Sequence, residues 1–216
     1  MNDSKWQKYA LIGGPLFVVL GLVGGFLPGS PPKPDADVNK ITTYFVNKDS
    51  KIEVGAWLGL LGAVALIWWF ATLWRHMSAA EGGRPRLAVA SLAGLLISGA
   101  MYTIASALSG AMALRSGDLG NNSTVLWALF NTAGGAGAIG VFIHLLSTSA
   151  LGFRSKMLPQ WASGLGLIAA LVNLVGSLSI ASDSSAIFAF AIIGFFAWSL
   201  WILVVTVVLW KAEPAS

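Results

Sequence analysis

Six long stretches of the chain contain no Asp, Glu, Lys or Arg, and every charged residue lies between or outside them. The hydrocarbon core of a bilayer is about 30 Å thick and needs roughly 20 apolar residues at helical rise, so each stretch is long enough to cross it. We therefore predict an all-α polytopic membrane protein with six transmembrane helices. The charge-free stretches are 9–32, 54–74, 87–114, 119–153, 157–182 and 184–210.

Six crossings use more than half of the 216 residues and leave little for a soluble domain. We expect a single integral membrane domain over residues 1–216. The absence of cysteine excludes disulfides, thiolate metal sites and a cysteine nucleophile. The predicted spans are 9–28, 54–74, 87–113, 125–148, 160–181 and 186–210.

The distribution of Lys and Arg predicts the topology, because positive residues near helix ends are retained in the cytoplasm. With the N-terminus inside, the inner segments hold eight basic and three acidic residues, a net charge of +5. The outer segments then hold five basic and six acidic residues, a net charge of −1. We predict a multi-pass protein of the bacterial cytoplasmic (inner) membrane with both termini in the cytoplasm. Its inner basic residues contact anionic lipids, and no pattern indicates a nucleic-acid partner.

The loop between the first two spans has an amphipathic pattern. Val38, Ile41 and Phe45 recur at helical spacing, and Asp35 or Asp37 precedes them as an N-cap. This pattern predicts a short amphipathic helix that lies on the outer membrane face and caps the bundle, with a receptor or lid role as the alternative.

His144 is the one histidine inside a span, and it continues a row of small residues, Ala133, Gly137 and Gly140, that faces the bundle interior. A neutral imidazole there bonds a carbonyl or hydroxyl of a neighbouring helix, or it serves as a gate, a substrate ligand or a proton-sensitive switch. A haem held by His76 and His144 is a minor alternative, because it needs both rings at one depth. We predict no cofactor and no metal site.

Other polar residues in the spans have two interpretations. Asn131 and Asn173 are costly to leave unpaired in hydrocarbon, so they form hydrogen bonds between helices or the floor of a polar site. Tyr102 belongs to a polar strip that either bonds its own helix or lines a narrow path.

Several tryptophans lie away from the headgroup level, where indole rings usually gather. Trp198 and Trp201 lie well inside the sixth span, and Trp68 shares a face of the second with Trp57. They wall an aromatic cavity, or they either face lipid or fill gaps between helices. The candidate ligand-binding or gating residues are His144, Asn131, Asn173, Tyr102, Trp68, Trp198 and Trp201.

Gly21 and Gly25 in the first span and Gly55 and Gly59 in the second have GxxxG spacing. Such faces pack helices of one chain or join copies into a homo-oligomer, and the spacing leaves both open.

The short segments Tyr44-Phe45-x-Asn47 and Leu158-Pro159-Gln160-Trp161 complete a layout that resembles small six-helix bacterial membrane proteins of unknown function. That resemblance implies no activity and no functional residue.

The sequence contains no G-x-S-x-G, H-E-x-x-H or P-loop motif, and we expect no catalytic residue. We predict a non-enzymatic membrane protein that binds a partner subunit or a lipid-like ligand. The alternative is a facilitator for a small neutral or hydrophobic substrate, with a path past Tyr102, Asn131, His144 and Asn173. A membrane enzyme acting on lipids is a weaker alternative, because the spans lack acid/base pairs.

Overall fold

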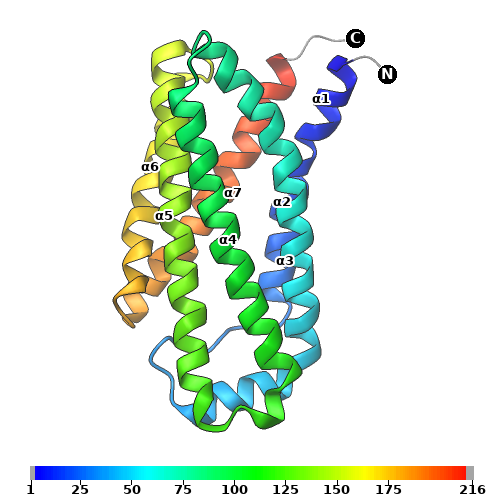
Figure 1. Ribbon diagram of the computed structural model, residues 1–216, viewed down its shortest axis with the longest axis vertical. Helices are drawn as coiled ribbons and strands as arrows, with labels where there is room; N and C mark the ends of the chain where they lie inside the picture. Colours follow the sequence, from blue (N-terminus) through cyan, green and yellow to red (C-terminus); the bar gives the residue numbers. More distant parts are fainter. Residues whose placement is uncertain (1–2, 213–216) are drawn as a thin grey trace.

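The computed structural model describes residues 3–212, and within that range the secondary structure is entirely helical (Figure 1). The remaining residues of the predicted domain, 1, 2 and 213–216, lie outside the described part. Six segments are long and apolar enough to cross a membrane, which confirms the predicted all-α, multi-pass class. The elements are α1 (Asp3–Leu11), α2 (Gly13–Phe26), α3 (Val38–Ala80), α4 (Arg86–Leu114), η1 (Ser116–Asp118), η2 (Gly120–Asn122), α5 (Ser123–Ser155), α6 (Gln160–Gly176), η3 (Ser177–Ile180) and α7 (Ser185–Ala212).

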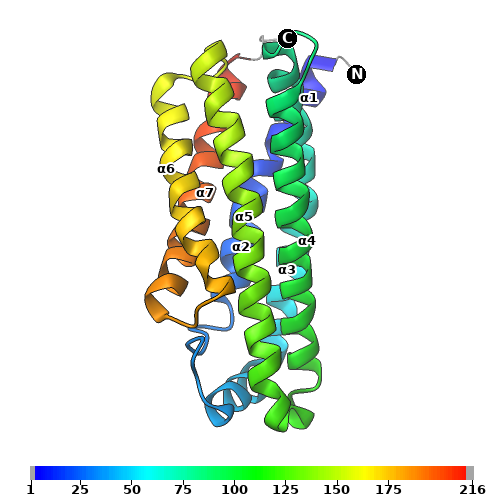
Figure 2. The ribbon, with the colours of Figure 1, turned by 60° about the vertical axis from the view of Figure 1, so that its left-hand side comes forward.

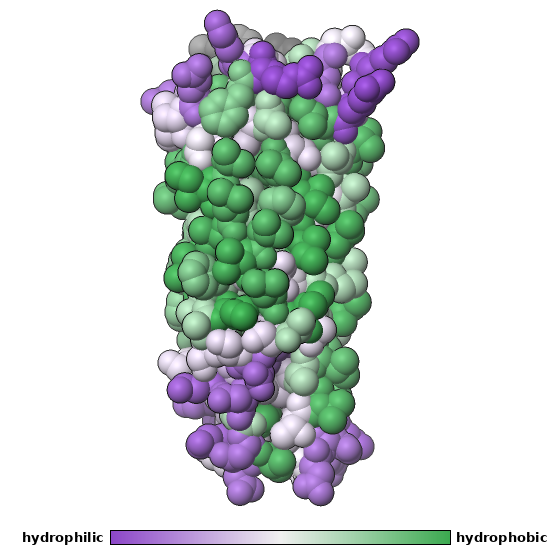
Figure 3. All heavy atoms as spheres, turned by 90° about the vertical axis from the view of Figure 1, so that its left-hand side faces the viewer, coloured by the Kyte–Doolittle hydropathy of each residue, from purple (hydrophilic) through white to green (hydrophobic). Residues whose placement is uncertain are grey.

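The helices follow one another around the bundle, each packed on the next, and α7 returns to α2 (Figures 1 and 2). Helix α5 also contacts α3 and α7, so it is the most buried of the six spans. Figure 3 shows an apolar band between two polar ends on one face. We call the end with the α2–α3 loop and η1 the outer end, after the predicted topology, and the opposite end the inner end.

Local chemistry sets the helix boundaries at the inner end. Pro15 has no N–H to donate to the carbonyl of Leu11, where α1 ends. Gly82 and Gly83 adopt φ values of 67° and 100° in the turn after α3, a region that favours glycine. Glu81 then caps α4, because its two carboxylate oxygens accept the N–H groups of residues 87 and 88 at 2.9 and 2.8 Å.

Helix α3 has 43 residues, so it is about 64 Å long at a rise of ~1.5 Å per residue and exceeds a bilayer with its headgroups. Figures 1 and 2 show its first turns lying across the outer end of the bundle. Asp37 is the N-cap, and its carboxylate accepts the N–H of Lys40 at 2.9 Å. The predicted amphipathic segment is therefore helical, but it continues into the second span, and Ile41 and Phe45 are buried against protein.

A separate apolar cluster fills the outer end, and we call it the outer cluster. Its centre is Trp127, which is 2% exposed, lies on Phe45 and stacks on Phe130 with ring centres 4.9 Å apart. The Trp127 indole N–H donates to the carbonyl of Lys33 at 3.0 Å and so ties the α2–α3 loop to α5. The buried members of the outer cluster are Ile41, Phe45, Ile52, Met112, Ala113, Leu119 and Trp127.

Close helix contacts in the membrane rely on glycine. A Cβ on Gly24 would lie 2.6 Å from the carbonyl oxygen of Gly55, and a Cβ on Gly94 would lie 2.6 Å from that of Gly140. These distances bring α2 to α3 and α4 to α5 backbone to backbone. The predicted glycine faces therefore serve contacts within this chain at Gly55 and Gly140, whereas Gly25 meets open space.

Candidate functional site

His144 lies at the centre of the bundle and is completely buried. Its Nδ1 is 2.8 Å from the hydroxyl of Ser91 on α4, and the Ser91 hydroxyl is 3.2 Å from that of Thr148. Thr148 in turn donates to the carbonyl of His144 at 2.8 Å. If the neutral imidazole carries its proton on Nδ1, His144 donates to Ser91, Ser91 donates to Thr148, and Thr148 donates to the His144 carbonyl. Each hydroxyl then has both a donor and an acceptor as partners.

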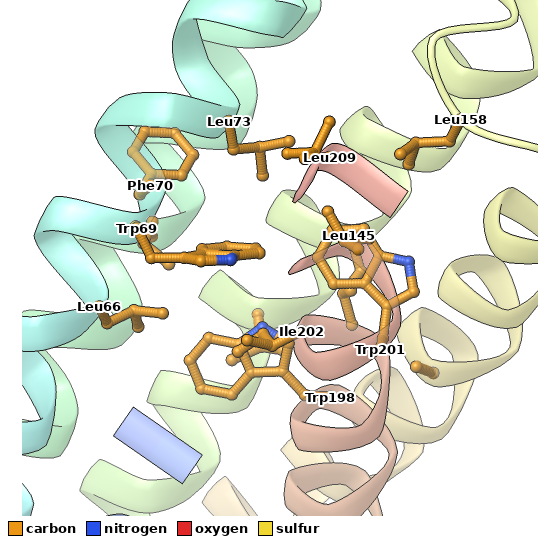
Figure 4. Packing of buried hydrophobic residues seen from close by; sticks show 14 of the residues in the cluster. Leu66, Trp69, Phe70, Leu73, Leu145, Leu158, Trp198, Trp201, Ile202 and Leu209 are labelled. Atoms are coloured by element: carbon orange, nitrogen blue, oxygen red, sulfur yellow. The ribbon is translucent and has the colours of Figure 1, made fainter. Parts of the chain in front are cut away.

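Three aromatic rings lie close to the imidazole. The ring centres of Phe70, Trp198 and Trp201 lie 5.7, 6.4 and 5.6 Å from that of His144, each at a steep angle. Figure 4 shows these three residues within the large buried apolar cluster, together with Trp69. The imidazole Nε2 and the indole N–H of Trp198 are buried and have no hydrogen-bond partner among the described residues. His144 is therefore a lone base in an aromatic cage, and its span contains no carboxylate to act with it.

The other predicted polar residues do not converge on His144. Asn131 lies thirteen positions before it on the same helix, which is roughly 20 Å at helical rise. Its amide donates to the carbonyl of Trp127 on its own helix at 2.8 Å. The Asn173 amide donates to the carbonyls of Ala169 and Gly194 at 2.9 and 3.1 Å, and so joins α6 to α7.

Tyr102 lies on the α4 face that meets α5, and its ring covers Gly137, whose Cβ would be 2.7 Å from a ring carbon. It thus fills the space beside a glycine between α4 and α5.

The aromatic residues divide between the interior and the lipid-facing surface. Trp198 and Trp201 are buried, but Trp68 is 54% exposed and its ring centre lies 6.3 Å from that of Trp6. The buried residue is its neighbour Trp69, whose indole N–H donates to Thr206 at 2.8 Å. Trp69 is not among the candidate site residues, although the apolar series Leu66, Trp69, Phe70, Leu73 and Met77 has the spacing of one helix face.

A hollow of about 240 Å³ opens at the outer end between α4 and α5, and we call it the outer groove. Met112 and Leu119 are buried and form its floor, while Arg115, Asp118 and Asn122 are exposed on its rim. The apolar walls are Leu108, Ala111 and Leu126.

The rim carries one charge of each sign. Arg115 Nε lies 3.4 Å from Asp118 Oδ2, and the two side chains are 78% and 70% exposed. An ion pair this exposed is weak in water, so both groups remain free to exchange partners. The groove therefore joins an apolar floor to a zwitterionic rim.

The groove lies at the end of α4 that is opposite Arg86. Helix α4 has 29 residues, or about 43 Å at helical rise, which matches a bilayer of roughly 40–45 Å with its headgroup layers. Arg86 begins this helix and Arg115 follows its end. Sequence reasoning missed the groove, although Leu108, Met112 and Arg115 fall on one face of the helix.

No group of three His, Cys, Asp or Glu side chains that could hold a metal ion occurs in residues 3–212. A haem between His76 and His144 stays a prediction. It requires room for a porphyrin beside His144, where the ring centres of Phe70, Trp198 and Trp201 lie 5.7, 6.4 and 5.6 Å from that of the imidazole.

Comparison with known proteins gives a family and no activity. The family model described as Domain of unknown function (DUF4386) matches residues 13–206. No curated protein and no solved structure matches the chain.

Proposed function

Because the chain belongs to the DUF4386 family, whose function is unknown, we propose its function from the geometry: it binds a membrane lipid in the outer groove. The observation that carries this proposal is the combination of an apolar floor and an ionic rim at one end of the helix bundle. A membrane lipid has the same order of groups along its length, with acyl chains toward the bilayer centre and charge at the surface.

The size of the groove indicates which part of the lipid it holds. A hollow of about 240 Å³ is smaller than a typical site for a drug-sized ligand. It accommodates the headgroup and the start of the acyl chains, and the remaining methylenes run over exposed apolar side chains. Ile104 on α4 and Leu129 on α5 are 45% and 49% exposed and supply such a surface.

Transport past His144 has less support. A path there needs space around the four predicted polar residues, but His144 is completely buried beside three aromatic rings and the Tyr102 ring lies on Gly137. Asn131 and Asn173 are bonded to backbone carbonyls. An enzyme is a weaker proposal still, because His144 lacks a partner acid within its span.

The test is native mass spectrometry of the protein purified in mild detergent. Leu126→Trp places a large side chain in the groove, and Leu146→Trp, on an exposed position of the same helix twenty residues away, is its matched control. We expect the wild type and Leu146→Trp to retain lipid and Leu126→Trp to lose most of it.

Equal lipid retention in the two variants would refute the proposal. A protein subunit or a second copy of the chain bound in the same spectra, without lipid, would instead favour the partner-binding alternative.

A further inference from the structure

We propose that the outer groove selects lipids with a phosphoethanolamine headgroup, an inference that rests on the proposed lipid-binding function. The rim holds one cation and one anion that touch each other, Arg115 and Asp118. A phosphoethanolamine headgroup also holds one anion and one cation, joined by two methylenes. Each charge of the headgroup therefore meets its opposite on the rim.

Arg115 provides the phosphate-binding half. Its contact with Asp118 is made through Nε, so the two terminal nitrogens of the guanidinium still have N–H groups to donate. Their planar, forked geometry matches two oxygens of a phosphate, which lysine cannot do. Asn122 on the same rim carries an amide that adds a neutral donor.

Asp118 provides the ammonium-binding half. Its Oδ2 faces Arg115, and Oδ1 is the oxygen that accepts an N–H from the headgroup. A primary ammonium has three N–H donors, whereas the quaternary ammonium of phosphatidylcholine has none. Asp118 therefore distinguishes ethanolamine from choline by hydrogen bonding and disfavours phosphatidylglycerol, which brings no cation to it.

The apolar part of the groove indicates a lipid rather than the free headgroup. The floor residues Met112 and Leu119 and the walls Leu108 and Leu126 offer no polar side chain, so they fit a glycerol backbone and the first methylenes. A soluble phosphoethanolamine leaves this surface uncovered and gains only the exposed ionic contacts, which are weak in water.

The experiment adds equal amounts of phosphatidylethanolamine, phosphatidylcholine and phosphatidylglycerol with matched acyl chains to the detergent-purified full chain and compares the adducts by native mass spectrometry. We expect phosphatidylethanolamine to exceed each of the others on the order of fivefold, the effect of about one net hydrogen bond. Asp118→Asn should remove that preference while binding of phosphatidylglycerol persists. Arg115→Gln should lower all three adducts, and Asp183→Asn, in the outer turn between α6 and α7, is the matched control that should change nothing.

The outcomes separate this inference from the proposed function. Lipid retained in the groove but led by phosphatidylcholine or phosphatidylglycerol, or an ethanolamine preference that survives Asp118→Asn, would overturn the headgroup assignment and leave lipid binding standing. No retention of any of the three lipids would overturn both. Displacement of bound lipid by excess soluble glycerophosphoethanolamine would overturn the assignment to a lipid, and we expect none.

Discussion

Replacing Gly94 by alanine should destabilise the bundle strongly, although it adds one methyl group. The new Cβ would lie 2.6 Å from the Gly140 carbonyl oxygen, 2.7 Å from the His144 nitrogen and 3.0 Å from Ile143 Cβ. Two of these three atoms belong to the α5 backbone, so no side chain can rotate away and the helices must separate. Overpacking of this kind typically costs about 1–3 kcal/mol.

Separation of α4 from α5 also breaks a second interaction. The Ser91 hydroxyl, one turn before Gly94, is 2.8 Å from His144 Nδ1. Such interhelical hydrogen bonds in membranes are worth ~0.6 kcal/mol on average. We therefore expect a loss of about 2–3 kcal/mol, and at roughly 2–4 °C per kcal/mol for a chain of this size the Tm should fall by about 5–10 °C.

The matched control is Gly99→Ala on the same helix, where an added Cβ meets nothing within 4 Å. Alanine is the better helix former, so this change should leave the Tm unchanged or raise it slightly. Thermal unfolding in detergent, followed by tryptophan fluorescence, compares the two variants. Equal Tm values for Gly94→Ala and Gly99→Ala would refute the close-contact argument.

Three further predictions test other parts of the molecule. Trp127→Phe keeps an aromatic ring in the outer cluster but loses the hydrogen bond to the Lys33 carbonyl, so the free energy of unfolding should fall by about 0.5–1.5 kcal/mol. Limited proteolysis should then cut the α2–α3 loop faster than in the wild type, and an unchanged rate of cleavage would contradict this prediction. Hydrogen bonds from the Lys40 backbone N–H and, after it, from the Lys40 side chain lower the pKa of Asp37. The cap therefore stabilises the fold at a pH above the ordinary Asp pKa, and this stabilisation is lost as the pH falls through the lowered pKa. The Tm of the wild type should exceed that of Asp37→Asn by less at about pH 3 than at about pH 7, and a difference that stays constant with pH would rule this out. Because the chain contains no cysteine, Asn121→Cys should react with an impermeant maleimide from outside intact cells and Gly82→Cys only after lysis; the reverse pattern would invert the predicted topology.

The helices of this bundle could be predicted from the sequence because the charges mark their ends. The absence of Asp, Glu, Lys and Arg from six stretches is a property of single segments, and the bilayer imposes it independently of how the segments pack. Which faces of the helices pack together could be seen only in the structure. Trp57 and Trp68, eleven residues apart, do share a face, but it is the exposed face of α3, and the buried indole is Trp69. In a membrane both faces of a span are apolar, so periodicity loses the contrast that separates inside from outside in water.

The outer end was hard to predict for a different reason. An amphipathic segment such as 38–48 has an apolar face, but that face fits a membrane surface and a protein surface equally well. Here it meets Met112, Ala113 and Leu119, residues from segments more than sixty positions away. The outer groove has the same origin, because its floor and rim come from α4, η1, η2 and α5 together.

Polar residues in spans gave the least reliable indication of a site, because a helix can satisfy them by itself. Thr148 and Thr206 each donate to the carbonyl four positions earlier on their own helix. This bond removes the cost of a polar group in hydrocarbon without any ligand or neighbouring helix. A polar residue in a span therefore indicates a site only through an atom that its helix leaves unbonded, such as the Nε2 of His144 or the Oδ1 of Asn131. By the same reasoning, charged groups at the ends of the spans are stronger candidates, because Arg115 and Asp118 are held by one exposed contact and keep donors and acceptors for a ligand.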